Sequence, residues 1–277
     1  MKKFIVALDG LNLSNSSIQT AIRLSKFHNA HLVGVFLDDF TRNSFSIYEV
    51  LESGQDFEKT VRLLAGKDAR IRDQAVIQFE EACQEARVNY SVHRDKGFSL
   101  PDLLRESIYA DLLILDANET FARHQEIPPT RFVKDLLAEV QCPVFLVPKH
   151  YMPVEKVVML YDGAPTAVFA IKMFSHILPC TLPAEVVTVK GEEDDLHLPE
   201  NKLMKEFMKR RCPQATYTVL KGEPETEVLR HLQTAQENTL IVLGAYQRSA
   251  VSRWFKNSMA DVLLRTLKCP LFIAHNK

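Results

Sequence analysis

The residues best suited to hold a phosphate lie in one segment near the C-terminus, residues 244–258. It begins with Gly244 at the end of an apolar run, where a glycine lets the backbone approach a ligand closely. It ends with Asn257-Ser258 before a predicted helix, and the free N–H groups of a helix start attract phosphate. Between these points lie the basic residues Arg248, Arg253 and Lys256. The pattern predicts an anion-binding loop, and the alternative is a long surface loop in which Asn257 only caps the helix.

Two aspartates stand at matching points earlier in the chain. Asp9 and Asp162 each precede a glycine and follow a short apolar run that predicts a strand. In an open parallel sheet, ligands lie beyond the carboxyl ends of the strands, so both aspartates are candidates for ligand contact. The structural alternative is that Asp-Gly forms a turn and the aspartate caps the next helix.

Four landmarks recur in the same order in the two halves of the 277-residue chain, which indicates an internal duplication. They are Val6–Gly10 with Met159–Gly163, Gly97 with Gly222, Leu112–Leu115 with Leu240–Leu243, and Cys142–Phe145 with Cys269–Phe272. The offset is 153 residues at the first landmark and 125 to 128 at the others, so the first half carries an insertion of ~26 residues, at about 39–66. The duplication predicts two domains, 1–148 and 154–277, joined by the proline-flanked linker 148–153.

Short apolar runs alternate with amphipathic stretches in both halves. The predicted strands are residues 4–8, 31–37, 90–93, 112–115 and 144–147, followed by 156–161, 184–189, 216–220, 239–243 and 270–274. The predicted helices are residues 15–27, 57–87, 100–108 and 130–140, followed by 165–176, 200–210, 225–235 and 258–267. This alternation is typical of parallel sheets with helical crossovers. The predicted fold class is α/β, with two tandem doubly wound parallel-sheet domains.

Composition and charge favour a folded protein of the cytoplasm. Hydrophobic residues make up 46% of the chain, and 34 basic against 35 acidic residues leave a net charge of -1, which gives no basis for binding nucleic acid or an anionic membrane. No apolar run approaches the ~18 residues of a membrane span. The five cysteines are widely spaced and contain no CxxC, so we expect reduced thiols, with neither a disulfide framework nor a zinc site.

The chain resembles the universal stress protein family in its tandem form, over nearly its whole length. The family motif is Gly, two residues, Gly, nine residues, Gly and then Ser or Thr, after the fourth strand of an adenine-nucleotide-binding α/β fold. The spacing is intact here, with Gly244 first, Gln247 and Asn257 in place of the other glycines, and Ser258 last. The first-strand aspartates, the Gly-Ala-Tyr-x-Arg-Ser sequence from Gly244 and the Cys-Pro before each last strand also match.

The resemblance implies an adenine-nucleotide site in the second half, with ATP or another adenine nucleotide as cofactor and magnesium beside it. The implied contacts are Asp162 at the adenine and ribose, Gly244 and Tyr246 in the middle, and Asn257, Ser258 and Met259 at the phosphates.

Gln247 is the expected obstacle to ATP, because its side chain stands where the family places bare backbone against phosphate. Asn257 tolerates a left-handed backbone better than most residues and preserves the turn. In the first half, the corresponding loop, residues 116–131, has none of the three glycines, and Asp116 replaces the first. Its acidic side chains predict that this half binds no triphosphate, and Thr130-Arg131 is interpreted as a helix cap.

The leading hypothesis is a cytoplasmic stress-response protein that acts by binding, with an altered adenine-nucleotide site in its second half. No phosphate loop, dinucleotide fingerprint, nucleophile elbow or zinc-protease motif is present, and the acidic run 192–195 is typical of a solvated loop. The alternative is a small-ligand-binding or interaction protein with both pockets degenerate. A slow ATPase is a third alternative, and it requires a water-activating residue that the sequence does not identify.

The last strands of the two halves are expected to pair with each other. Members of the family commonly pair through their last strands, and residues 142–147 and 269–274 are apolar edges that would be hazardous if exposed. We therefore expect the two halves to form a pseudo-dimer within one chain, and further oligomerisation is left open. The expected ligand is a nucleotide, and neither nucleic acid nor a membrane is expected as a partner.

Overall fold

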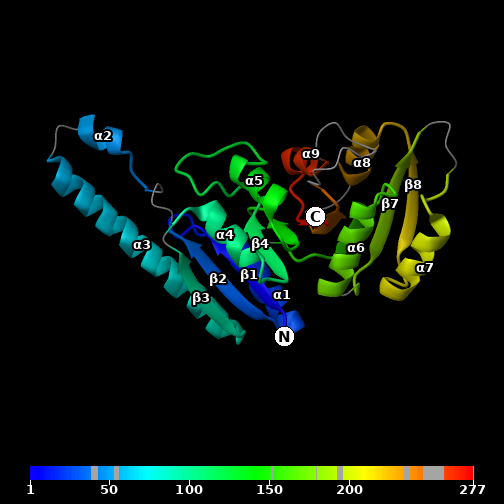
Figure 1. Cartoon of the computed structure of the whole chain (residues 1–277), viewed down its shortest axis with the longest axis horizontal. Helices are drawn as coiled ribbons and strands as arrows, with labels where there is room; N and C mark the ends of the chain where they lie inside the picture. Colours follow the sequence, from blue (N-terminus) through cyan, green and yellow to red (C-terminus); the bar gives the residue numbers. More distant parts are fainter. Residues whose placement is uncertain are drawn as a thin grey trace. The chain divides into compact units, whose positions relative to one another are not determined.

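The computed structural model divides the chain into two compact units, Met1–Gln141 (unit 1) and Cys142–Lys277 (unit 2). The described residues are 1–38, 43–52, 56–95, 97–150, 152–178, 180–191, 196–233, 238–245 and 259–276. Figure 1 shows both units and labels their helices and most of their strands.

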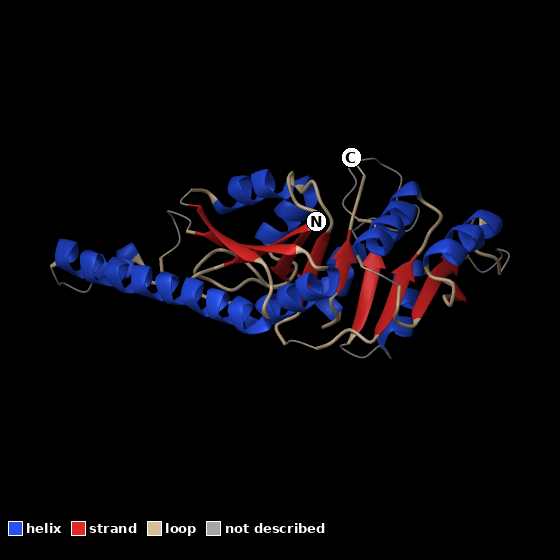
Figure 2. Cartoon of the chain, turned by 90° about the horizontal axis from the view of Figure 1, so that it is seen from below, coloured by secondary structure: helices blue, strands red, loops and turns tan. Residues whose placement is uncertain are grey.

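Unit 1 contains a parallel sheet with strand order β3-β2-β1-β4. Its strands are β1 (Lys3–Leu8), β2 (His31–Leu37), β3 (Tyr90–Asp95) and β4 (Leu112–Asp116). Its helices are α1 (Asn15–His28), α2 (Ile47–Glu52), α3 (Phe57–Ala86), α4 (Ser99–Ser107) and α5 (Arg131–Glu139). Figure 2 shows helices on both faces of this sheet, which buries its central strands.

Unit 2 repeats this arrangement, with strand order β5-β10-β9-β6-β7-β8. Its strands are β5 (Val144–Val147), β6 (Lys156–Leu160), β7 (Ala184–Lys190), β8 (Thr216–Lys221), β9 (Thr239–Leu243) and β10 (Leu271–Ile273). Its helices are α6 (Pro165–Ile177), α7 (Asn201–Arg211), α8 (Pro224–Gln233) and α9 (Met259–Thr266). All its described strand pairs are parallel except that of β5 with β10.

The predicted α/β class with doubly wound parallel sheets is confirmed in both units. The continuous apolar runs become central strands because both faces are covered: five of the six residues of β1 and all of β9 are buried. Two helices begin with side chains that are typical of N-caps. Ser14 accepts a hydrogen bond from Ser17 N at the start of α1, and Thr130 accepts one from Val133 N at the start of α5. No helix in the described part of the chain has the length and apolarity needed to cross a bilayer.

The two last strands pair with each other, as expected. β10 runs antiparallel to β5, with Phe272 opposite Phe145. The pairing covers both apolar edges, and it places β5 in unit 2, so the compact units divide between Gln141 and Cys142. The domain limits at 148 and 154 stay a prediction from the repeat.

The insertion of the first half contains α2 and the beginning of α3. Only Val50 of α2 is buried, whereas α3 is a 30-residue helix whose C-terminal half packs on the sheet. At the contact, a Cβ on Gly34 of β2 would lie 2.6 Å from the ring of Phe79, so the glycine allows the helix to approach.

The expectation of five reduced cysteines is wrong for two of them. Cys180, just after α6, forms a disulfide with Cys212 at the end of α7, and their Cα atoms are 5.2 Å apart. The two residues are 32 positions apart and lie on different elements, so sequence spacing gives no sign of the bond. Cys83, Cys142 and Cys269 form no disulfide and are buried.

Each unit carries a cluster of one lysine, one glutamate and one histidine, with the lysine on β1 in unit 1 and on β6 in unit 2. In unit 1, Glu106 pairs with Lys3 (Nζ to Oε2, 3.0 Å) and His93 (Nδ1 to Oε1, 2.8 Å). Burial raises the pKa of Glu106, but the hydrogen bonds from Lys3 and His93 outweigh it and hold the pKa below its usual range.

In unit 2, the carboxylate at the centre of the cluster is Glu185 of β7. It pairs with Lys156 (2.7 Å) and His231 (3.1 Å) and accepts a hydrogen bond from Thr218 Oγ1 (2.6 Å). Burial again raises the pKa of Glu185, while these partners together hold it below its ordinary value. Both clusters therefore keep their central carboxylate ionised.

Candidate functional site

Strand order changes direction at one point in each unit, and the candidate residues flank that point. In unit 2 it lies between β6 and β9, which are followed by Asp162 and Gly244. In unit 1 it lies between β1 and β4, with Asp9 after β1 and Asp116 at the end of β4. Ligands of open parallel sheets bind at this switch point, so the fold brings the predicted residues of both halves to the expected edge.

Asp162 forms the tight turn that its structural interpretation predicts. Its Oδ1 accepts a hydrogen bond from Ala164 N (2.8 Å), and Gly163 adopts φ +84°. A Cβ on Gly163 would lie 2.7 Å from Cβ of Pro199, so the glycine is required by both conformation and space. One carboxylate oxygen of Asp162 thus holds the turn that begins α6.

Tyr161 links this turn to the segment that leads into α7. Its hydroxyl donates a hydrogen bond to Pro199 O (3.1 Å), just before α7. Burial, with smaller contributions from Glu200 and Asp162, raises the pKa of Tyr161, so the hydroxyl stays protonated as a donor. Pro199 therefore borders the edge on the side of β7.

Gly244 is held close to the backbone of α6. A Cβ at this position would lie 2.5 Å from Thr166 O and 2.9 Å from Ala167 N. From the sequence, we expected this glycine to let a ligand approach the backbone closely. In the structure, the close contact is with the first turn of α6. Packing alone thus requires a glycine at the end of β9.

We expect Gly244→Ala to lower the free energy of unfolding of unit 2 by about 2 kcal/mol, because backbone atoms of α6 must move to admit the methyl group. Urea denaturation followed by circular dichroism measures the change. Gly66→Ala in α3 is the matched control, because its Cβ would meet nothing within 4 Å, and it should stabilise the helix by up to ~1 kcal/mol. Equal effects of the two substitutions would contradict the steric explanation.

Four predicted site residues, Tyr246, Gln247, Asn257 and Ser258, lie outside the described residues, as does the acidic run 192–195. Met259 is described, and it opens α9 with its side chain buried. The nucleotide contacts implied for these residues stay predictions.

In unit 1 the same edge is lined by carboxylates. Asp9 is buried, and its Oδ1 accepts a hydrogen bond from Leu11 N (2.9 Å). Asp116 accepts hydrogen bonds from Ser14 Oγ (2.8 Å) and Asn118 N (2.8 Å). The acidic side chains predicted for this loop therefore hold the loops after β1 and β4.

Glu119 turns back on its own loop at the position of the second motif glycine. Its Oε1 accepts hydrogen bonds from Thr120 N (2.9 Å) and Phe121 N (2.8 Å). Burial and the nearby charge of Asp9 raise the pKa of Glu119 to about 7, even though these amide hydrogen bonds oppose the rise. Two backbone donors that would suit a phosphate are thus engaged by a carboxylate of the same chain.

The start of α5 is occupied in a similar way. Thr130 is the N-cap, as predicted, and its hydroxyl also donates to Glu119 O (2.5 Å). Arg131 N, in the first turn, donates to Oε2 of Glu126 (2.7 Å). The first turn of α5 therefore already binds a carboxylate of the same chain, a contact that the sequence did not reveal.

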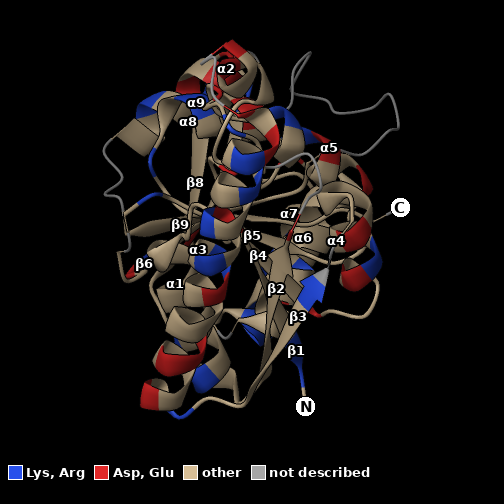
Figure 3. Cartoon of the chain, turned by 90° about the vertical axis from the view of Figure 1, so that its left-hand side faces the viewer, with Lys and Arg blue, Asp and Glu red and all other residues tan. Residues whose placement is uncertain are grey.

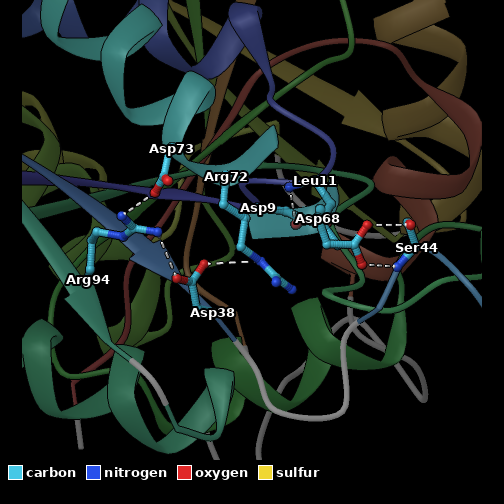
Figure 4. Close-up of polar contacts among 8 residues, drawn as sticks. All are labelled: Asp9, Leu11, Asp38, Ser44, Asp68, Arg72, Asp73 and Arg94. Carbon is cyan, nitrogen blue, oxygen red and sulfur yellow. Dashed lines mark hydrogen bonds and ion pairs between the residues drawn. The ribbon is translucent and has the colours of Figure 1, made fainter. Parts of the chain in front are cut away.

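The helix α3 adds a further polar network that sequence analysis missed (Figure 4). Asp38, after β2, pairs with Arg72 (3.2 Å) and Arg94 (3.2 Å), and Arg94 also pairs with Asp73 (2.7 Å). Asp68 is 1% exposed and accepts hydrogen bonds from Ser44 N (2.8 Å) and Oγ (2.5 Å). These partners are distant in sequence, and only the fold brings them together.

A cavity of 280 Å³ remains in unit 1 between α3 and the loop after β1. Gly10, Leu11 and Leu13 form one wall, and residues of α3 between Lys67 and Gln78 form the other. It lies on the side of the insertion, beside the turn of Asp9.

Comparison with known proteins identifies the family of the second half. Residues 174–275 match the model of the universal stress protein family. None of the curated proteins is similar enough in sequence to count as a relative. The match includes β7 to β10, and so the strand that precedes Gly244.

Solved structures extend the similarity to both units. A universal stress protein from Archaeoglobus fulgidus DSM 4304 is similar over 99% of this chain and 96% of its own, with 14% identity and a TM-score of 0.69. A functionally unknown protein from Pseudomonas aeruginosa PAO1 is similar over 99% of this chain and 92% of its own, with 14% identity and a TM-score of 0.57. Residues 174–275 therefore match the universal stress protein family, and the whole chain shares the fold of a universal stress protein.

Proposed function

We propose that the protein is a stress-response protein of the universal stress protein type that binds an adenine nucleotide in unit 2 alone. The nucleotide would lie at the edge between β6 and β9. Asp162 would face the adenine and ribose, and the segment 244–258 would surround the phosphates. Binding, rather than bond cleavage, is the proposed activity, and magnesium would enter with the phosphates of ATP.

The observation that carries this proposal is the contrast between the two edges. In unit 2 a glycine, Gly244, follows the strand beside Asp162, and the family match includes this strand. In unit 1 the corresponding positions hold Asp116 and Glu119, and Asp9 adds a third carboxylate.

A triphosphate at the edge of unit 1 would meet two penalties. Like charges lie at the position that its phosphates would take, and Glu119 already accepts the hydrogen bonds of Thr120 N and Phe121 N. Displacing Glu119 would leave a buried carboxylate without its donors. The unit 2 edge carries no carboxylate at the position of Gly244, which favours one site per chain.

The test is a calorimetric titration of the full chain with magnesium ATP, for which we expect one site per chain. Asp162→Ala should raise the Kd about tenfold or more, because a hydrogen bond to a charged group contributes roughly 1.5–3 kcal/mol. The matched control, Asp9→Ala, should leave the Kd unchanged because its edge binds no phosphate. Two sites of equal affinity, or equal losses in both variants, would contradict the proposed asymmetry.

A second pair of variants separates the proposal from its alternative. Gln247→Gly, alone and with Asn257→Gly, restores the family motif and should lower the Kd for ATP, mostly through the first change. If neither the wild type nor the double variant binds ATP, although circular dichroism shows both folded, an interaction protein with degenerate pockets becomes the better explanation. Release of phosphate from bound ATP would instead indicate the slow ATPase.

A further inference from the structure

No helix in the described part of the second half is as long as α3. This helix contains 30 residues, whereas α7, which follows β7, contains 11. At 1.5 Å per residue it is about 45 Å long. Its buried residues Asp68, Ala75, Phe79 and Cys83 lie along one side, which leaves the opposite side facing solvent.

That opposite side presents a continuous row of exposed residues, which we call the α3 seam. Its members are Lys59, Leu63, Arg70, Gln74, Ile77 and Glu81, of which Arg70 and Gln74 are exposed and also border the cavity beside the loop after β1. Their spacings of 4, 7, 4, 3 and 4 follow the helical repeat, so all six lie on one side of the helix. Two of them are large aliphatic residues with high exposure, Leu63 (74%) and Ile77 (48%).

The charges of α3 are separated along its length (Figure 3). Residues 57–72 carry five basic and two acidic side chains, and residues 73–86 carry four acidic and no basic ones. The helix macrodipole acts on the first and last turns, where α3 has Glu58 at its start and no basic residue at its end. Over the rest of its length, the charge distribution of α3 is complementary to that of an identical helix that lies against it in the antiparallel direction.

We propose that the α3 seam binds the α3 seam of a second copy of this chain, antiparallel about a two-fold axis at Arg70. In this register Leu63 of one copy packs against Ile77 of the other, and Lys59 lies opposite Glu81. The symmetry makes each of these contacts twice. The two aliphatic pairs lose their exposure to water, and the basic half of each helix lies along the acidic half of the other.

The two Arg70 side chains form the one like-charged pair of this arrangement, because they face each other across the two-fold axis. A parallel arrangement would instead align the basic halves with each other throughout, so charge selects the antiparallel direction. The register therefore predicts effects of opposite sign: loss of Arg70 strengthens association, and loss of the other seam residues weakens it.

Sedimentation velocity of the full chain over a range of concentrations tests this interface, and we expect a reversible dimer. Leu63→Asp should raise the dimer Kd more than about tenfold, since it places a charge against Ile77. Lys59→Glu should raise it about threefold to tenfold, and Lys59→Glu with Glu81→Lys should restore it, because the reversed pair is again complementary. Arg70→Ala should lower it.

Leu203→Asp on α7 is the matched control, because Leu203 is 62% exposed but lies outside the seam, and it should leave the Kd unchanged. A chain that stays monomeric at its highest soluble concentration would overturn the proposal. So would a dimer that responds to Leu203→Asp as it does to Leu63→Asp, or one that the double charge reversal fails to restore. The measurement needs no nucleotide, so it is independent of the proposed function.

Discussion

Reduction of the Cys180–Cys212 disulfide is expected to lower the free energy of unfolding of unit 2 by about 3–4 kcal/mol. The bond joins residues 32 positions apart, and opening it frees the unfolded chain to explore more conformations. It also holds the C-terminal end of α7, a helix of which only Met204 and Met208 are buried. Urea denaturation of the wild type with and without a thiol reductant measures the change.

The double variant Cys180→Ser with Cys212→Ser provides the control. Its midpoint should equal that of the reduced wild type and should not respond to reductant, since the three remaining cysteines form no disulfide in the structure. A wild-type chain whose thiols are all shown to be reduced, but whose midpoint is unchanged, would contradict the assigned role of the bond.

Replacing Glu119 by glutamine is expected to stabilise unit 1 by up to about 3 kcal/mol at pH values above 7. The pKa of Glu119 is raised to about 7 by burial and by Asp9, so the folded chain holds this proton more tightly than the unfolded chain does. The contribution of the carboxyl group to stability is therefore complete below pH ~4.5, its usual range, and is lost as the pH rises through about 7. Glutamine keeps an oxygen acceptor for the two amides and carries no charge.

The difference between Glu119→Gln and the wild type should therefore vanish near pH ~4 and grow as the pH rises, which denaturation at several pH values can follow. Glu126→Gln is the control, because this exposed carboxylate accepts a hydrogen bond at the start of α5, and its loss should cost up to ~1 kcal/mol. A Glu119→Gln variant that is less stable than the wild type at pH ~8 would show that the ionised carboxylate is needed by its loop.

Most of the fold follows from patterns that are local in sequence. Apolar runs such as residues 4–8 predicted buried parallel strands, and all eight helices expected from periodicity are present in the described structure within a few residues. The short helix α2 was missed because only Val50 of its six residues is buried, which leaves no periodic apolar face to detect.

The sites depend more on contacts between distant residues. The switch-point positions of Asp9 and Asp162 could be predicted, because a residue that follows a strand must lie at its carboxyl end. The engagement of Glu119 with its own loop could not, because that depends on the path of the backbone after Asp116. The pairing of Arg72 with Asp38 could not be predicted from the sequence either, because it depends on how the chain returns to the sheet after the insertion.

The two lysine–glutamate–histidine clusters record how the halves diverged after duplication. Lys3 and Lys156 correspond directly, and the repeat aligns Glu106 of α4 with His231 of α8, whereas His93 aligns with Thr218 and Glu185 aligns with Leu32. Returning only one partner to its counterpart, as in His231→Glu, would set two carboxylates against each other beside Lys156. The two halves therefore build the same balance of one carboxylate, one ammonium group and one imidazole, with the carboxylate on a helix in unit 1 and on a strand in unit 2, and a linear alignment of the halves does not reveal this likeness.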